Sequence, residues 1–178
     1  MMVGVKTLVI TGVEVTPGNK NDSPELPSLI AQTAKNFDMR EVSADLGYYG
    51  KKNLHAIVNA GALPYIPFKP TSRPDRKDQL WTRNLAYFVA NQPEWMAHYH
   101  KRSLSESLFS SVKRVLGSTV KAKSFDGQVS EVYLKVLAHN LRMLVHAMYE
   151  LGIDPKFWND GPVFPPSLPP SNENGSPR

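Results

Sequence analysis

The chain has 178 residues, of which 41% are hydrophobic and 21% charged, a composition typical of one globular domain with its own core. It contains no cysteine, which excludes a disulfide framework, a thiolate metal site and a cysteine nucleophile. No apolar run approaches the length of a membrane span and no signal peptide opens the chain, so we expect a cytoplasmic protein without a membrane partner.

The net charge of +5 is distributed unevenly along the chain. Residues 1–60 carry 6 basic and 6 acidic side chains, residues 61–124 carry 11 and 4, and residues 125–178 carry 4 and 6. The positive charge therefore gathers in the middle of the sequence, as a surface that follows phosphates requires.

Strand and helix patterns alternate in the first half of the chain. The β-branched residues of 1–16 indicate the end of one strand and then a second strand. A helix is predicted from Pro24 to Phe37, with Asp22 or Ser23 as its cap. The elements expected next are a strand at 39–44, a helix at 51–60 and a strand at 63–68. This order predicts an α/β fold with some parallel strand pairing.

Helices dominate the second half. After a basic loop at 69–78, helices are predicted at 79–90 and at 99–113, the latter ending near Gly117. The longest predicted helix runs from 126 to 151. Its spacing predicts one buried face, made by Val129, Val132, Val136, Leu137, Leu141, Leu144 and Met148. Composition divides the chain into a domain at 1–153 and a disordered tail, rich in Pro, Ser and Asn, at 154–178.

The stretch 99–113 carries a candidate site. If it forms one helix, Tyr99, Glu106 and Lys113 lie seven residues apart and share a face, which Arg102 joins from four residues before Glu106. Glu106 is then a candidate ligand of a hard cation, and the phenol and the two cations are candidate phosphate contacts. A charged helix face that is merely solvated is the alternative interpretation.

These four residues also match a family signature. Their spacing, Tyr-x2-Arg-x3-Glu-x6-Lys, resembles that of DDE transposases of bacterial insertion sequences. The segment 43–48, in which Asp45 follows a predicted strand and precedes a short turn with an aromatic residue, resembles the second acidic motif of that family. The resemblance extends over roughly residues 3–151.

The resemblance implies an RNase H-like fold, in which helices flank a central mixed sheet and three carboxylates hold two Mg²⁺ or Mn²⁺ ions. Asp45 matches the second carboxylate and Glu106 the third, so both are expected to be catalytic and to bind metal. The first Asp has no counterpart, and we expect its strand to lie upstream of Met1. In the family this Asp bridges the two ions, which repel each other at a separation of about 4 Å.

Three nearby acids are possible replacements for the first Asp. Glu14 is expected to face solvent, because Val13 and Val15 point the other way along a strand. Asp22 is expected to cap a helix, and Asp38 to lie in a turn. None of the three is therefore expected to complete the site.

Basic residues around the motifs are the candidate DNA contacts. The resemblance implies that Tyr99, Arg102 and Lys113 hold phosphates near the cleaved end, and Arg114 adjoins them. The loop at 69–78 is a second candidate, with a solvated loop as the alternative. Its basic residues, suited to sequence-independent phosphate contacts, are Lys69, Arg73, Arg76 and Lys77.

The sequence therefore predicts the C-terminal part of the catalytic domain of a DDE transposase, an enzyme that cleaves transposon ends and joins them to target DNA. By resemblance it would act as a homodimer at the bacterial nucleoid. Because the first Asp is missing, we expect this chain alone not to nick DNA. Two alternatives stay open: a remnant that binds DNA or a full-length partner without cutting, and a decayed reading frame without function.

Overall fold

The computed structural model describes residues 1–150 and residue 152, so the expected tail at 154–178 lies outside the described residues. The α-helices are α1 (Leu26–Ala34), α2 (Lys51–Asn59), α3 (Gln79–Ala90), α4 (Gln92–Tyr99), α5 (Ser103–Leu116) and α6 (Phe125–Glu150). The strands are β1 (Met2–Val3), β2 (Ile10–Gly12), β3 (Glu41–Ser43) and β4 (Leu63–Tyr65). Short 3-10 helices lie at η1 (Ser23–Glu25), η2 (Leu46–Tyr48) and η3 (His100–Arg102). No helix within this part of the chain combines the length and apolarity needed to cross a bilayer.

The fold is mixed α/β, as expected, but its strands form two small sheets. β3 and β4 pair in parallel, with α2 as the crossover between them, which confirms the expected parallel pairing. β1 and β2 form a separate antiparallel pair. The single mixed sheet expected from the sequence is therefore not formed by the described residues, and β1 and β3 each have only one strand partner among them.

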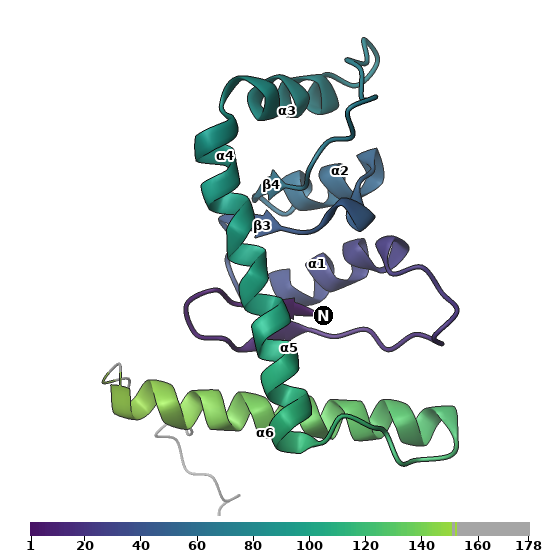
Figure 1. Ribbon diagram of the computed structural model, residues 1–178, viewed down its shortest axis with the longest axis vertical. Coiled ribbons are helices and arrows are strands. Elements are labelled where there is room, and N and C mark those ends of the chain that lie inside the picture. Colours follow the sequence, from purple (N-terminus) through teal and green to yellow (C-terminus); the bar gives the residue numbers. More distant parts are fainter. Residues whose placement is uncertain (151, 153–178) are drawn as a thin grey trace, which may run out of the picture.

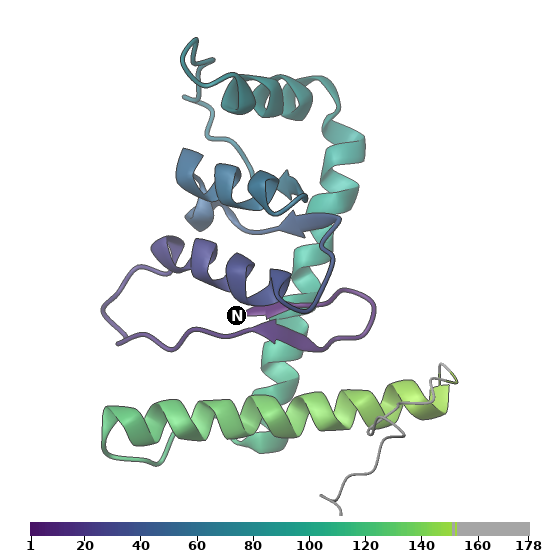
Figure 2. The same ribbon diagram turned by 180° about the vertical axis from the view of Figure 1, so that it is seen from behind.

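Hydrophobic contacts hold the elements in a column, with α3 at one end and α6 at the other (Figures 1 and 2). The first cluster joins α1, α2, β3 and the segment around β4, and its centre is Ile57, which is completely buried. A second cluster packs α2 against α3 through Leu54, Phe68 and Trp81. A third joins β2 to α5 and α6. α4 and α5 run along the column, so this middle part of the sequence extends over most of the length of the column.

The stretch 99–113 is not one α-helix. Tyr99 is the last residue of α4, His100–Arg102 form η3, and α5 begins at Ser103. A 3-10 segment has about 3.0 residues per turn instead of 3.6, so it rotates the side chains before it relative to those after it. Tyr99 nevertheless stays next to the Glu106 face, because the Arg102 guanidinium that pairs with Glu106 also lies 5.2 Å from the ring centre of Tyr99.

The predicted long helix is confirmed almost to the residue, and its buried face is confirmed in part, since Val132 and Val136 pack against the third cluster. Leu137 and Leu141 were expected inside, yet both are more than half exposed. The fully buried positions are His139 and Ala147. The reason is that α6 lies across the end of the column (Figure 1) and is covered on one side only, by β2, its preceding loop and α5.

Candidate active site

Asp45 lies two residues after the end of β3 and is the N-cap of η2. Its Oδ1 atom accepts a hydrogen bond of 2.8 Å from the backbone N–H of Gly47. A Cβ atom at position 47 would come within 2.8 Å of the same oxygen, so glycine allows this turn to close. Oδ2 has no hydrogen-bond partner among the described residues, and the side chain is exposed. The strand end therefore presents one carboxylate oxygen to incoming ligands.

Glu106 lies in the first turn of α5, where the helix dipole favours a negative charge. Its carboxylate forms an ion pair with Arg102, four residues earlier. This hydrogen bond raises the pKa of the Arg102 guanidinium, which also lies 5.2 Å from the ring centre of Tyr99. The Glu106 side chain is 66% exposed, and exposed ion pairs contribute little stability. Glu106 can therefore exchange Arg102 for another cation at small cost.

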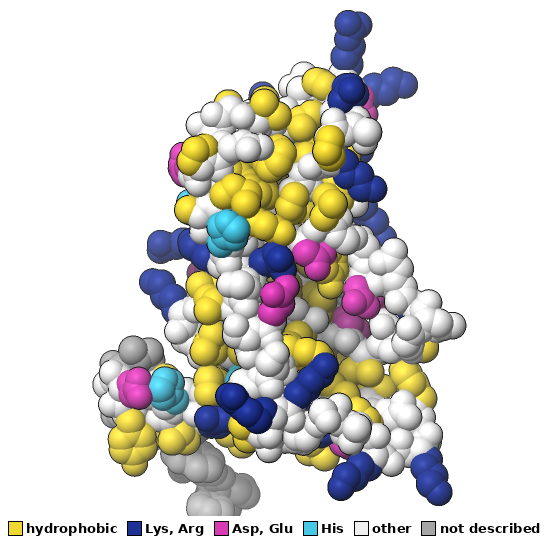
Figure 3. Space-filling model, viewed as in Figure 1, with side chains coloured by type: hydrophobic (Ala, Val, Ile, Leu, Met, Phe, Trp, Pro, Cys, Tyr) yellow, Lys and Arg dark blue, Asp and Glu magenta, His cyan; other side chains and the backbone are white. Residues whose placement is uncertain are grey.

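Both acidic candidates line one cavity of about 220 Å³. The cavity lies between β1 and β3, with α1 on one side and η3 with the start of α5 on the other. Asp45, Glu106 and Arg102 all contribute to its lining. Figure 3 shows acidic side chains gathered beside α5 in the middle of this face. Two residues 61 positions apart in the sequence are thus brought to one place.

A third carboxylate in the same cavity, Glu41, was missed by the sequence analysis. It forms ion pairs with His98 and Lys101, and the His98 ring stacks on Tyr65 at 4.5 Å. Burial raises the pKa of Glu41, but the hydrogen bonds from Lys101 and His98 outweigh it and the net shift is downward. Glu41 is therefore ionised but already neutralised. The only sequence signal was the alternation Glu-Val-Ser at 41–43, which places Glu41 opposite the buried Val42.

Comparison with protein families decides what kind of site this is. The family described as "Transposase DDE domain" matches residues 1–141, most of the chain and both acidic candidates. The chain belongs to the DDE transposase domain family. This membership supports a function in DNA transposition, with DNA as the partner. No solved structure matches the chain.

The donor set of this DDE domain suits a hard divalent cation. Mg²⁺ in phosphate-transfer sites is held by one or two carboxylates, with waters and phosphate oxygens as its other ligands. Asp45 and Glu106 can supply two such carboxylates from one cavity. Among residues 1–150 and 152, no three Asp, Glu or His side chains form a group that could hold a metal. A bridged pair of ions would need a carboxylate in addition to Asp45 and Glu106.

The other candidates on α5 lie farther along the domain. Lys113 lines a second, more apolar cavity of about 290 Å³, and its Nζ atom lies 4.3 Å from the ring centre of Phe109. Met1, Leu29 and Tyr48 line both cavities, so the two are neighbours. Arg114 is exposed and lines neither cavity. Tyr99 stacks on Trp95 at 5.3 Å and also lies outside both.

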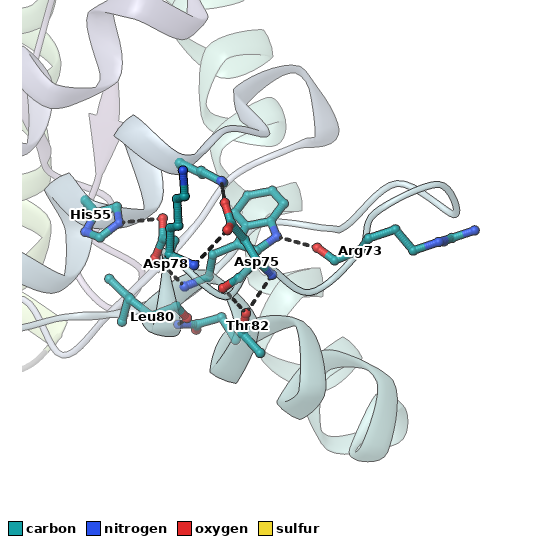
Figure 4. Close-up of polar contacts among 10 residues, drawn as sticks. His55, Arg73, Asp75, Asp78, Leu80 and Thr82 are labelled. Carbon is teal, nitrogen blue, oxygen red and sulfur yellow. Dashed lines mark hydrogen bonds and ion pairs between the residues drawn. The ribbon is translucent and has the colours of Figure 1, made fainter.

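The basic loop before α3 is well anchored and separate from the acidic cavity. Figure 4 shows how its acidic residues hold it: Asp78 caps α3 by accepting from Trp81 N–H at 2.9 Å and contacts His55, while Asp75 bonds Thr82. Lys51 forms an ion pair with Asp75. None of the four basic candidates lines the cavity of Asp45 and Glu106: Lys69, Arg73, Arg76 and Lys77. Arg76 and Lys77 are exposed at the α3 end of the column.

None of the three acids considered as replacements for the first Asp lines the cavity of Asp45 and Glu106. Glu14 accepts hydrogen bonds from Ser28 and Gln32 and lines the second cavity. Asp22 also lines the second cavity; it occupies the N-cap position of η1, as expected, but its side chain makes no capping hydrogen bond. The neighbouring Asn21 bonds the backbone N–H of Ser23 instead. Asp38 is exposed in the connection before β3.

Proposed function

We propose that this chain is the catalytic part of an insertion-sequence transposase of bacteria, which cleaves DNA at element ends and transfers the strands to a target. The observation that carries this proposal is the convergence of Asp45 and Glu106 on one cavity in a chain of the DDE family. Both carboxylates keep oxygen atoms accessible, as ligands of a catalytic cation must. The signature spacing at Tyr99, Arg102, Glu106 and Lys113 supports the same assignment.

In this proposal Asp45 and Glu106 hold a Mg²⁺ or Mn²⁺ ion. Such an ion, when bound, polarises the scissile phosphate and lowers the pKa of bound water. Water attacks phosphorus and the P–O3′ bond breaks, which leaves a 3′-hydroxyl group. That hydroxyl then attacks a target phosphate and displaces a second 3′-oxygen. Arg102, released from Glu106 when the cation binds, is placed to contact a phosphate oxygen at the same cavity.

We further propose that DNA follows the cationic side chains outside the cavity. Tyr99, Lys113 and Arg114 would contact the phosphates near the cleaved end, and the basic loop would contact flanking phosphates without reading sequence: Lys69, Arg73, Arg76 and Lys77. With DNA as substrate, the protein would work at the nucleoid of the bacterial cytoplasm, as a pair of identical subunits.

An RNase H-like architecture is part of the proposal. The cavity lies between β1 and β3, and neither strand has a second strand partner among the described residues. One further strand between them would join both pairs into a single mixed sheet. A carboxylate on that strand would lie beside Asp45 and Glu106, where the bridging ligand of a metal pair is needed.

A second candidate function is DNA binding without cleavage. It is favoured by Glu41, the one other carboxylate of the cavity, whose charge is already neutralised by His98 and Lys101. Within the described residues only Asp45 and Glu106 are then available as cavity ligands. A chain with two available carboxylates can retain a cation and DNA but lacks the bridge that two ions require.

Mn²⁺ binding and DNA nicking separate these possibilities. We expect the chain to bind Mn²⁺, detected by loss of the free-ion EPR signal, and Asp45→Asn or Glu106→Gln to weaken binding by at least about tenfold. Glu94→Gln, an exposed acid outside the cavity, is the matched control. We expect no nicking of duplex DNA by the chain alone. Nicking that depends on Glu106 would show that two carboxylates suffice, and wild-type Mn²⁺ binding equal to that of both cavity variants would refute the metal site.

A further inference from the structure

The outer face of α6 carries a continuous hydrophobic stripe that nothing in the described part of the chain covers. Its members are between 51% and 84% exposed: Leu134, Leu137, Leu141, Val145 and Tyr149. They follow one another at intervals of three or four residues, which keeps them on one side of the helix. A continuous apolar surface of this kind usually marks an interaction site.

The stripe is held outward, because the opposite face of α6 is firmly attached. Asn140 accepts a hydrogen bond from Ile10 N–H at 2.8 Å and donates one to the Ile10 carbonyl at 2.9 Å. His139 contacts the Leu8 carbonyl at 2.9 Å and is buried. Leu141 is two residues from His139, so their side chains point about 200° apart around the helix. The stripe therefore needs a cover that comes to it from outside the described domain.

The chain itself continues from one end of the stripe. α6 ends at Glu150, directly after Tyr149. Gly152 has a φ of 62°, the left-handed conformation with which glycine ends a helix and turns the chain away from the helix axis. Residues 153–178 follow this turn. The nearest candidate to cover the stripe is therefore the C-terminal segment of the same chain.

The sequence at 157–168 has the composition that such a cover requires. It reads Phe-Trp-Asn-Asp-Gly-Pro-Val-Phe-Pro-Pro-Ser-Leu, with apolar pairs at 157–158 and at 163–164. Its prolines favour the extended polyproline II conformation, which loses little entropy on binding and commonly docks on apolar, aromatic surfaces. A segment of this composition cannot build a core of its own, but it can bury its apolar side chains against an existing surface.

The spacing of the two apolar pairs matches the length of the stripe. Val145 and Leu134 are 11 residues apart on a helix that rises about 1.5 Å per residue, which separates them by about 17 Å. Trp158 and Phe164 are six residues apart, which in polyproline II, at about 3.1 Å per residue, corresponds to about 19 Å. If the segment runs back along α6 after Gly152, Trp158 meets Val145 and Phe164 meets Leu134.

Charge supports the same arrangement. Arg142 is exposed and lies seven residues before Tyr149, so it borders the stripe on the Tyr149 side. The ion pairs of α6 do not include it, and Arg142 has no acidic partner within residues 1–150 and 152. Asp160 follows Trp158 by two residues, which brings its carboxylate to the level of Arg142 when Trp158 covers Val145. The segment therefore supplies both the apolar side chains and the negative charge that this face lacks.

We propose that the outer face of α6 is the docking surface of this chain's own C-terminal segment, residues 153–168, which runs back along the stripe in an extended conformation. This surface is separate from the proposed metal site and from the proposed DNA contacts. Independent partners usually need more than about 1,000 Å² of buried surface, which one helix face does not provide. A segment joined to the helix is present at a millimolar effective concentration, so weaker contacts keep it bound.

Cysteine pairs in the full chain test the arrangement, because the natural sequence contains no cysteine. Under mild oxidation, Val145→Cys with Asn159→Cys should form an intramolecular disulfide at least about tenfold faster than Glu150→Cys with Asn159→Cys. Glu150 is the matched control, since it is exposed and nearer in sequence but lies about 140° around the helix from Val145. An undocked segment would react at least as fast with Glu150→Cys, which would overturn the proposal. Disulfides between two chains would assign the stripe to a second copy and overturn it as well.

Trp158 provides a second measurement without a cross-link. The difference in acrylamide quenching between wild type and Trp158→Phe reports Trp158, because Trp81 and Trp95 are buried and common to both proteins. Leu141→Glu places a carboxylate in the stripe and should raise the quenching constant of Trp158 at least about twofold. Val89→Glu, on an exposed hydrophobic residue of α3, should leave it unchanged.

Circular dichroism melts of the two glutamate variants establish that the fold is retained. Quenching of Trp158 that is the same in wild type and Leu141→Glu would refute docking on the stripe. Neither measurement uses DNA or a metal ion. A chain that fails both tests but still binds Mn²⁺ through Asp45 and Glu106 would refute the α6 docking surface alone and leave the proposed catalytic function intact.

Discussion

At the scale of single residues, the carboxylates that line the cavity differ in whether protein cations neutralise them or leave their oxygens free to bind a metal ion. Glu41 is held by His98 and Lys101, whereas Asp45 and Glu106 keep exposed oxygens. Lys101 belongs to η3 and His98 to α4, so their ion pairs with Glu41 attach these two helices to β3. We therefore assign Glu41 a positioning role beside the two proposed metal ligands.

The variant Glu41→Gln is predicted to lower the free energy of unfolding at pH 7 by about 1 kcal/mol, because it removes an ion pair that is partly shielded from water. The pKa of Glu41 is lowered in the folded state, so its stabilisation is present above its ordinary value of 4.5 and is lost as the pH falls below that value. Urea unfolding at pH 7 and at pH 3 measures both effects. The difference between wild type and variant should shrink at pH 3.

Asp38→Asn supplies the matched control for this prediction, since Asp38 is exposed and forms no ion pair with the described residues. If the stability difference between wild type and Glu41→Gln were as large at pH 3 as at pH 7, the shape of the side chain rather than its charge would determine the effect.

The role of Glu41 could not be predicted from the sequence. Its partners lie 57 and 60 residues away, and no local pattern identifies them.

At the scale of elements, the attachment of α6 depends on one side chain that imitates a neighbouring strand. The Asn140 amide bonds both the N–H and the C=O of Ile10, as a strand partner would. Val132 and Val136 add apolar contacts to β2 and α5. The hydrogen bonds of Asn140 therefore fix the rotation of α6 about its axis, and the valine contacts provide most of the buried apolar surface between α6 and the rest of the domain.

Replacement of Asn140 by Ala is predicted to reduce the free energy of unfolding by about 2–3 kcal/mol, because both backbone groups of Ile10 lose their partner in a partly buried position. Urea unfolding measures the loss, and hydrogen exchange should show faster exchange in β2 than in α2. Asn140→Asp retains the acceptor for Ile10 N–H but not the donor. His146→Ala, on an exposed residue of the same helix, should change stability by less than about 0.5 kcal/mol. Equal losses in all three variants would contradict this role.

The ends of several helices could be predicted from the sequence, because capping and helix-breaking residues act locally. Gly61 ends α2 with a φ of 81° and Gly117 ends α5 with a φ of 90°, both as expected for glycine after a helix. The 3-10 turn at 100–102 and the exposure of Leu141 were not accessible. Both depend on what packs beside the helix, and periodicity is the same for an inward and an outward apolar face.

At the scale of the whole molecule, the cationic middle of the sequence does not form one patch. Residues 61–124 include α3, α4 and α5, which reach from one end of the column to the region of α6 (Figure 1). Their basic side chains are therefore spread along the column, with Arg76 and Lys77 near α3 and Lys121 and Lys123 before α6. Net charge alone predicts attraction to DNA but does not locate its path.

The salt dependence of DNA affinity locates that path. If DNA contacts the basic loop, the double variant Arg76→Gln/Lys77→Gln should lower the slope of log K against log salt by about 1.8, since each lost phosphate contact removes about 0.9. These two side chains are exposed and form no ion pair within the described residues, so their loss should not alter the fold. Lys121→Gln/Lys123→Gln makes the same charge change near α6 and should leave the slope unchanged. Fluorescence anisotropy with a short duplex at several salt concentrations measures both slopes. The reverse outcome, with only the second pair reducing the slope, would place DNA across the α6 end of the column instead.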